Sequence, residues 1–201
     1  NDIKNVGVND HEIDLFEGQF IVPNGMSYNS YIIMDEKIAV MDSVDANFGD
    51  QWIANIKEVL GDKTPDYLVV HHMEMDHSAN IKKFMETFPT AKIVSSKLAF
   101  VMMKNYFGTD FSENQIVVTE GSSLELGKHK LNFVTAPNVH WPEVIMSYDS
   151  TDKVLFSADL VQQGYHRNDD DGDDENAQIS GAHHRQGFHK QINTHVINLQ
   201  S

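Results

Sequence analysis

Hydrophobic residues recur with two different periods along the first part of the chain, which predicts alternating strands and helices. Residues 30–33 and 40–41 are short apolar segments separated by a polar turn, and they predict two paired strands. Residues 13–20 predict a further strand. Apolar side chains at helical spacing between residues 52 and 60 predict a helix that ends at Gly61.

A regular succession of strands and helices follows. The strands are predicted at residues 67–70, 91–94 and 115–118, and the helices at residues 78–88 and 96–107. Shorter strands are predicted between residues 123 and 159. In the second of these helices, an apolar stripe is expected to face the core; it consists of Leu98, Val101, Met102 and Phe107. Two sheets flanked by helices, an α+β sandwich, are the expected architecture.

Potential metal ligands are concentrated immediately after the strand predicted at residues 67–70. His72, Glu74, Asp76 and His77 form the pattern H-x-E-x-D-H. An extended chain puts His72 and Glu74 on one face, and a turn into the next helix brings Asp76 and His77 round to them. Each residue has an ordinary structural explanation, such as a helix N-cap for Asp76. Together these groups would repel or desolvate one another unless a cation compensates, so the sequence predicts a metal site with room for two ions.

Two residues later in the chain extend this group. His140 lies in a loop between the apolar segments 131–134 and 144–146, and Asp159 follows the apolar segment 154–158. Alone, His140 is an unremarkable loop histidine and Asp159 an unremarkable turn residue. With the first motif, they predict a larger set of ligands.

The combined pattern resembles the metallo-β-lactamase-like domain of the flavodiiron proteins, which reduce dioxygen or nitric oxide at a non-haem diiron centre. Flanking stretches agree, including residues 20–31, 140–143 and 156–159. The resemblance covers about residues 3–160 and implies an αββα sandwich. It also implies that one iron is bound by His72, Glu74 and His140, the other by Asp76 and His77, and that Asp159 bridges the two.

The sequence departs from this family after residue 161. The family supplies a further His to the second iron and then an FMN-binding flavodoxin-like domain, and neither has a counterpart at its usual place in these 201 residues. We expect residues 1–161 to form the diiron domain and residues 162–201, with the polar run 168–176, to form a loosely ordered tail. The tail histidines that could replace the absent ligand are His183, His184, His189 and His195. Alternatively, the tail is not native to this fold.

Glu74 bears on which metal is bound. Hydrolytic members of the broader fold have an imidazole at this place, and a carboxylate favours iron over zinc. The expected function is reduction of dioxygen to water, of nitric oxide to nitrous oxide, or both, at two iron ions and without a catalytic side chain beyond the ligands. Because no FMN is expected on this chain, electrons would come from an external flavoprotein or rubredoxin-like donor. A zinc-dependent hydrolase and a catalytically silent metal-binding domain remain as alternatives.

Composition restricts the other properties. A chain of 201 residues that is 40% hydrophobic is long enough for one domain with its own core. The net charge of −15 argues against nucleic acid as a partner, since phosphate binding needs a basic surface. The absence of cysteine excludes disulfides, thiolate zinc sites and iron–sulfur clusters held by this chain. Without an apolar run long enough to cross a membrane, we expect a cytoplasmic protein, and a homodimer is one assembly that the family resemblance allows.

Overall fold

Two packed β-sheets form the centre of the molecule in the computed structural model, which describes residues 2–16, 20–23, 25–161 and 196–198. One sheet has six strands in the order β1 (Ile3–Asn5), β6 (Tyr31–Ile33), β7 (Ala39–Met41), β8 (Tyr67–Val69), β9 (Lys92–Ser95) and β10 (Gln115–Val117). Its first three strands are antiparallel, whereas β7 to β10 are parallel. The carboxyl ends of β7, β8 and β9 therefore meet at one edge of the sheet.

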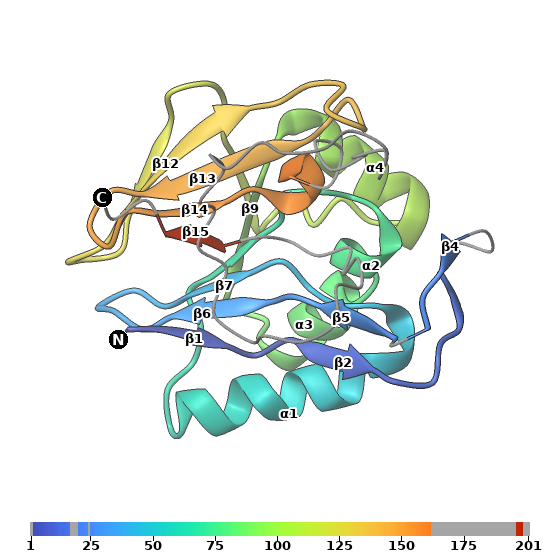
Figure 1. The fold of residues 1–201 in the computed structure, drawn as a ribbon. Helices are drawn as coiled ribbons and strands as arrows, with labels where there is room; N and C mark the ends of the chain where they lie inside the picture. Colours follow the sequence, from blue (N-terminus) through green and yellow to red (C-terminus); the bar gives the residue numbers. More distant parts are fainter. Residues whose placement is uncertain (1, 17–19, 24, 162–195, 199–201) are drawn as a thin grey trace, which may run out of the picture.

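The second sheet is antiparallel throughout. Its five strands are β11 (Ser123–Glu125), β12 (Lys130–Thr135), β13 (Ile145–Asp149), β14 (Val154–Phe156) and β15 (Val196–Asn198). Two small ribbons pair β2 (Val8–Asp10) with β5 (Met26–Tyr28), and β3 (Leu15–Phe16) with β4 (Phe20–Ile21). The two sheets lie one above the other in Figure 1, with β12 to β15 in the upper layer and β1, β6 and β7 in the lower layer.

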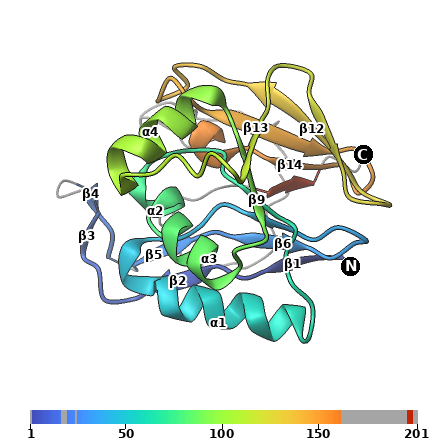
Figure 2. The same cartoon turned by 180° about the vertical axis from the view of Figure 1, so that it is seen from behind.

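Helices cover the outer face of the six-stranded sheet. They are α1 (Gly49–Leu60), α2 (Met75–Ser78), α3 (Ile81–Thr87) and α4 (Lys97–Phe107). A short 3-10 helix, η1 (Ala46–Phe48), precedes α1, and another, η2 (Ala158–Val161), follows β14 of the second sheet. Seen from behind, α1, α3 and α4 lie in front of the sheet (Figure 2). In α4 the first turn is capped by the Ser96 hydroxyl, which accepts the Ala99 N–H, and Gly108 ends the helix at a φ of 72°.

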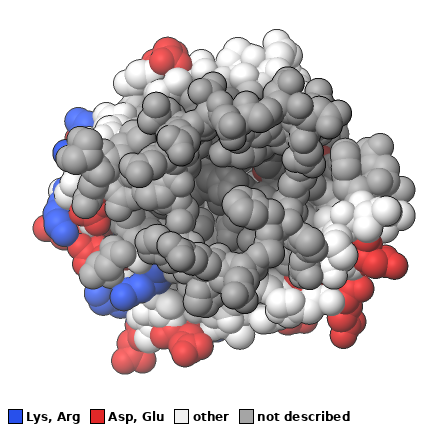
Figure 3. Space-filling model, in the orientation of Figure 1, with Lys and Arg blue, Asp and Glu red and all other residues white. Residues whose placement is uncertain are grey.

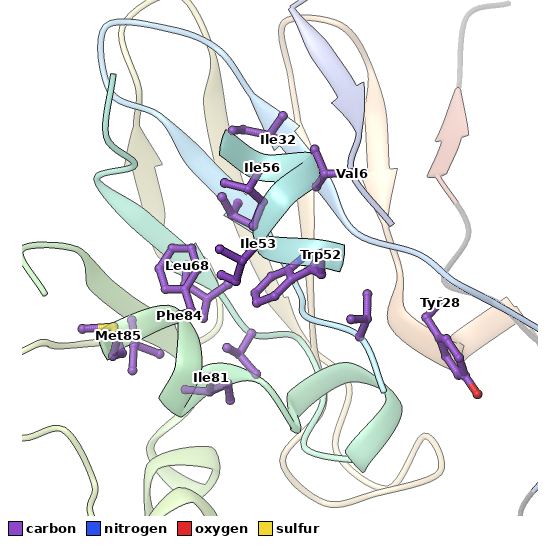
Figure 4. Packing of buried hydrophobic residues seen from close by; sticks show 14 of the residues in the cluster. Val6, Tyr28, Ile32, Trp52, Ile53, Ile56, Leu68, Ile81, Phe84 and Met85 are labelled. Atoms are coloured by element: carbon purple, nitrogen blue, oxygen red, sulfur yellow. The ribbon is translucent and has the colours of Figure 1, made fainter. Parts of the chain in front are cut away.

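Side chains alternate between the two faces of the six-stranded sheet, and this alternation builds two cores. Ile32 and Leu68 face the helices, whereas their neighbours Ile33 and Val69 face the second sheet. On the helix side, Trp52 of α1 stacks at a tilt on Phe84 of α3 with ring centroids 5.8 Å apart, and Figure 4 shows this cluster. On the other side, the second core includes Phe133 and Phe156 of the five-stranded sheet.

The layers agree with an α+β metallo-β-lactamase-like sandwich. Among the described residues, three of its layers are present, because the α-helices that this part of the chain contains pack on the six-stranded sheet. The predicted pair of strands is confirmed as β6 and β7, and the predicted helix that ends at Gly61 is confirmed as α1. The helix predicted for residues 78–88 is α3, which begins later, at Ile81; the short helix α2 precedes it and shares only Ser78 with the prediction.

Two local predictions were wrong. The strand predicted for residues 13–20 is instead the short ribbon of β3 and β4. In α4 half of the predicted stripe was wrong: Leu98 and Val101 are 41% and 50% exposed, whereas Met102 and Phe107 pack partly buried against the core. The buried residues of this helix are Ala99, Phe100 and Met103. Residues 98–103 are all apolar, so the periodicity did not define which face packs on the sheet.

The region after residue 161 contributes one described element. Strand β15 pairs with β14 in antiparallel register, Leu155 lying opposite Ile197. The rest of the predicted tail, with the candidate histidines His183, His184, His189 and His195, lies outside the described residues. The division of the chain at residue 161 therefore stays a prediction.

The distribution of surface charge and the length of the helices also bear on the sequence predictions. Acidic side chains are spread along the described rim of the face in Figure 3, with a smaller basic group at its left, as expected for a net charge of −15. Within the described part of the chain, no helix is both long and apolar enough to cross a membrane.

Candidate metal centre

The predicted ligands begin at the carboxyl end of β8, where the chain passes from the sheet into α2. Met73 is fully buried and anchors the loop, so that its neighbours His72 and Glu74 project from the same segment. The loop is also held through α2, because the Ser43 N–H donates to the carbonyl of His77 at 2.8 Å. The site therefore lies where parallel strands end, between the two sheets.

One group of four side chains converges on a common point. It consists of His72, Glu74, His140 and Asp159, and each offers a ligand atom within 4.8 Å of the others. Glu74 Oε2 lies 3.1 Å from His72 Nε2 and 2.8 Å from His140 Nε2. Asp159 Oδ2 lies 3.8 Å from His72 Nε2. This arrangement gathers two imidazoles and two carboxylates around a volume suited to one ion.

A second group adjoins the first through a shared residue. Asp76, His77 and Asp159 also place one ligand atom each within 4.8 Å of one another. His77 Nε2 lies 3.1 Å from Asp159 Oδ1 and 3.6 Å from Asp76 Oδ2. Asp159 thus turns Oδ1 toward one group and Oδ2 toward the other. The six side chains proposed from the sequence are brought together by segments up to 87 positions apart (72 to 159).

The backbone is in an unusual conformation at three places around these groups. Asp42, His140 and Ala158 have φ angles of 56°, 54° and 45°, in the left-handed region that residues with a β-carbon rarely adopt. At Ala158 this conformation turns the chain from β14 into η2, and the next residue is Asp159. At His140 it tightens a loop closed by a hydrogen bond from the Ala136 N–H to the carbonyl of Val144 at 2.9 Å. Such conformations cost energy and cluster at functional sites.

Burial and nearby charges raise the pKa of some candidate ligands and lower the pKa of others. Burial raises the pKa of Asp76 to about 6, and the nearby charge of Asp159 adds to this effect. Burial would also raise the pKa of Asp159, but the charge and hydrogen bond of His77 more than offset it, so this pKa is lowered. For His72, burial is outweighed by hydrogen bonds with Glu143 and Glu74, which raise its pKa to about 9. Without a metal, the imidazoles thus act as the counter-charges of the carboxylates.

One buried atom shows that the protein groups do not fully satisfy one another. Asp76 Oδ1 is inaccessible and has no hydrogen-bond partner among the described residues. A buried carboxylate oxygen without a partner is costly unless an ion or an unseen group compensates it. A cation between Asp76, His77 and Asp159 would do so, and carboxylates and neutral imidazoles are its ordinary ligands. The donor set therefore fits two metal ions.

Two buried acids that sequence reasoning did not assign support the histidines. Glu143 Oε1 lies 2.7 Å from His72 Nδ1. Asp42 Oδ2 lies 2.9 Å from His71 Nδ1 and 3.9 Å from His77 Nδ1, and His71 Nε2 lies 2.8 Å from the Ser147 hydroxyl. The signal available in the sequence was the acid three positions after His140; nothing in the sequence marked Asp42.

Trp141 lies beside the candidate ligands His72 and His140. Its ring meets the ring of His72 edge to face, with centroids 5.2 Å apart. The ring of His140 makes a similar contact with His72 at 5.2 Å. These contacts restrict the orientation of the His72 ring.

A further cluster of potential ligands has a structural explanation. His129, Asp149 and Asp152 lie close enough together to hold a metal ion. However, the Asp149 carboxylate accepts the N–H groups of Thr151 and Asp152 and lies 2.9 Å from His129 Nδ1. His129 Nε2 in turn lies 3.3 Å from Asp2 Oδ2. The cluster ties the turn between β13 and β14 to the N-terminal segment.

Comparison with known proteins places this geometry in a family. A sequence model described as "ODP family beta lactamase" matches residues 26–197. The chain belongs to this family. The match extends past residue 161, where the composition changes, and includes most of β15.

Relatives of this ODP-family domain include flavodiiron proteins. It is 36% identical over 160 residues to a nitric oxide reductase of Moorella thermoacetica, an alignment that covers 79% of this chain and 40% of the relative. Its fold is similar to the flavodiiron protein of Giardia intestinalis, with a TM-score of 0.71, 32% identity and coverage of 79% and 38%. It is also similar to the rubredoxin oxygen:oxidoreductase of Desulfovibrio gigas, with a TM-score of 0.74, 33% identity and coverage of 79% and 39%.

These coverages define what the likeness describes. The ODP-family domain aligns over about four fifths of its own length but spans 40% or less of each of these relatives. The expected family and the metallo-β-lactamase-like fold are therefore confirmed, and the likeness corresponds to the diiron domain of the longer proteins.

Proposed function

We propose that this domain holds two iron ions and reduces dioxygen, nitric oxide or both with electrons from an external donor. The observation that supports this most directly is the shared carboxylate, since Asp159 offers one oxygen to each of two adjacent ligand groups. The relatives named as a nitric oxide reductase and as a rubredoxin oxygen:oxidoreductase support the reaction class.

The proposed ligands follow the two groups. His72, Glu74 and His140 would bind one iron, Asp76 and His77 the other, and Asp159 would bridge them. Counted over both groups, three of the six candidate ligands are carboxylates and three are imidazoles, so the set is not the neutral imidazole cage that zinc favours. This mixed and anionic donor set is better suited to Fe(II) and Fe(III). A tail histidine as an additional ligand remains part of the proposal.

The chemistry divides between the ions and the protein. Bound iron would supply electrons to the gas and an open position for it. The protein's part is to fix the ligands and to limit access: His72 is buried, lies 2.7 Å from Glu143 Oε1 through its Nδ1, and contacts the ring of Trp141 edge to face. Asp76, whose pKa is raised by burial, would be ionised on metal binding because the cation favours its charged form. No side-chain nucleophile is needed.

The electron donor is proposed to be a separate protein or domain. The name of the Desulfovibrio gigas relative refers to rubredoxin, which supports a rubredoxin-like or flavoprotein donor. We do not expect this domain to bind FMN by itself, since its likeness to the longer relatives corresponds to their diiron domain. A homodimer that brings a donor to the site is part of this proposal.

A single-turnover experiment tests the function. The chain is loaded with Fe(II) under anaerobic conditions, freed of unbound metal, reduced chemically and mixed with dioxygen or nitric oxide in a stopped-flow instrument. We expect bound iron close to two per chain, rapid oxidation, and nitrous oxide as the product of nitric oxide. A chain with both His72→Ala and His77→Ala is the control and should retain little iron and show no such phase.

The alternatives give different results in the same series. Zinc-dependent cleavage of a thioester or β-lactam, without oxidation of the iron-loaded chain, would replace the proposal by a hydrolase. Tight iron binding without reaction toward either gas would identify a catalytically silent metal-binding domain. Failure to bind iron at all would contradict the metal centre itself.

A further inference from the structure

We propose that Glu143 is a positioning residue for His72: it fixes the imidazole through Nδ1 and adds negative charge behind the metal position that His72, Glu74, His140 and Asp159 form. This inference rests on the proposed metal centre and concerns a residue outside its ligand set. In this proposal Glu143 determines how strongly His72 binds the metal and how its ring is oriented.

The contact that supports the proposal is short and fully enclosed. Glu143 Oε1 lies 2.7 Å from His72 Nδ1, and both side chains are completely buried. The same oxygen accepts the N–H of Met73 at 2.9 Å. An ionised carboxylate only accepts hydrogen bonds, so His72 must have its hydrogen on Nδ1. The Nε2 atom then faces Glu74 and Asp159, where a metal ligand is needed.

Glu143 is itself held in place by its backbone. The Ser96 hydroxyl, at the start of α4, donates to the carbonyl of Glu143 at 2.9 Å. Two residues further on, the N–H of Ile145 donates to the carbonyl of His71 at 3.0 Å. The segment that contains Glu143 is thus fixed to the helix layer and to the loop of His72 at once. A carboxylate on this segment can impose its position on the imidazole.

The negative charge of Glu143 exceeds what the loop requires. Oε2 of Glu143 is buried and has no hydrogen-bond partner among the described residues. An amide oxygen at the Oε1 position would satisfy both His72 and Met73 without adding a charge in the interior. A buried charge is costly even when it is paired, so a carboxylate in place of an amide points to a role beyond support of the loop. A metal ion on the far side of the imidazole supplies that role, because the carboxylate strengthens the ligand that binds it.

A metal titration separates this role from a general effect on stability. Co(II), which has visible absorption bands in protein sites, is titrated into chains in which only one position retains all its ligands. His77→Ala retains the position that includes His72, and His72→Ala retains the one that includes His77. Adding Glu143→Gln to His77→Ala should weaken Co(II) binding by about 10- to 100-fold. Adding it to His72→Ala should leave binding unchanged.

The controls distinguish failure of this inference from failure of the proposed function. Glu58→Gln, an exposed acid-to-amide change on α1, should alter neither titration. Equal weakening in both backgrounds, or none in the His77→Ala background, would overturn the role of Glu143 while leaving the metal centre intact. No Co(II) binding by the unsubstituted chain would instead refute the metal centre.

A measurement on the unsubstituted chain tests the proposal even if Glu143→Gln does not fold. In nitrogen–proton correlation spectra of the zinc-loaded protein, His72 should show a slowly exchanging hydrogen on Nδ1 and a metal-shifted Nε2 resonance. The assignment comes from the signals lost in His72→Ala. A His72 with its hydrogen on Nε2 would overturn the proposed orientation, since Nδ1 could not then donate to Glu143.

Discussion

Replacing Asp159 by Asn should uncouple the stability of the domain from metal. The substitution nearly preserves the shape of the side chain but removes the charge that lies between the two ligand groups. In the chain without metal, it removes the ionic part of the 3.1 Å contact with His77 and also relieves repulsion from Glu74. These effects oppose one another, so the stability of the two chains without metal does not test the prediction. The quantity that tests it is the increase in stability that each chain shows when metal is added.

That gain can be worked out from binding linkage. At a free metal concentration about 100 times the Kd, one site stabilises the folded state by about 2.7 kcal/mol. For a domain of this size, about 1 kcal/mol raises Tm by roughly 2–4 °C, so one filled site raises it by roughly 5–11 °C. If loss of the bridging carboxylate weakens binding about 100-fold, the same metal concentration contributes only about 0.4 kcal/mol, or roughly 1–2 °C. Because Asp159 belongs to both groups, both contributions should fall together.

Thermal unfolding followed by circular dichroism, with and without Mn(II) or anaerobic Fe(II), measures this difference directly. Asp62→Asn, an exposed change in the turn after α1, is the matched control and should keep the full metal-dependent rise in Tm. Metal analysis of the desalted proteins provides an independent count of bound ions. An Asp159→Asn chain with the same metal-dependent rise as the control would refute the inference that Asp159 bridges two metal positions.

Three further outcomes are expected. Glu74→His should shift metal preference from iron toward zinc, because an imidazole replaces a harder carboxylate; unchanged competition between Fe(II) and Zn(II) would contradict the ligand argument. Phe84→Ala should lower the free energy of unfolding by about 3–5 kcal/mol in urea titrations, since this fully buried ring packs on Trp52. The pKa of His129 is raised, because hydrogen bonds with Asp149 and Asp2 outweigh burial, which lowers it. Its protonated form therefore stabilises the fold below the unfolded pKa of about 6.5, and this contribution is lost as the pH rises through the folded value. In chelator, the stability difference between the unsubstituted chain and His129→Gln should shrink as the pH is raised from 6, and a constant difference would exclude this explanation.

Local chemistry accounts for what the sequence predicted correctly. The candidate ligands His72, Glu74, Asp76 and His77 lie within six positions, so their proximity follows from the strand end and the turn into α2. The helix ending at Gly61 and the paired strands β6 and β7 are similarly determined by residues close in the chain. His140 and Asp159 were identified through the resemblance to a family, since their distance in sequence gives no physical reason for contact.

Other features depended on packing between distant segments. In α4 residues 98–103 are all apolar, so only the sheet beneath it decided that Phe100 and Met103 are buried while Leu98 and Val101 are exposed. The start of α3 at Ile81, later than predicted, likewise depended on tertiary contacts, because the Asn80 side chain donates to the carbonyls of Val44 and Asp45 at 2.9 Å.

The same distinction holds within the candidate metal centre. The sequence by itself determined which side chains could bind a metal, because donor atoms and their spacing belong to the residues. Only the tertiary structure decided that Asp159 turns one oxygen toward each group, and that the buried acids Glu143 and Asp42 lie behind the histidines. Those contacts join β7, β8, the segment before β13 and the end of β14. Their strength comes from burial between two sheets, which raises electrostatic interactions among groups that water would otherwise separate and screen.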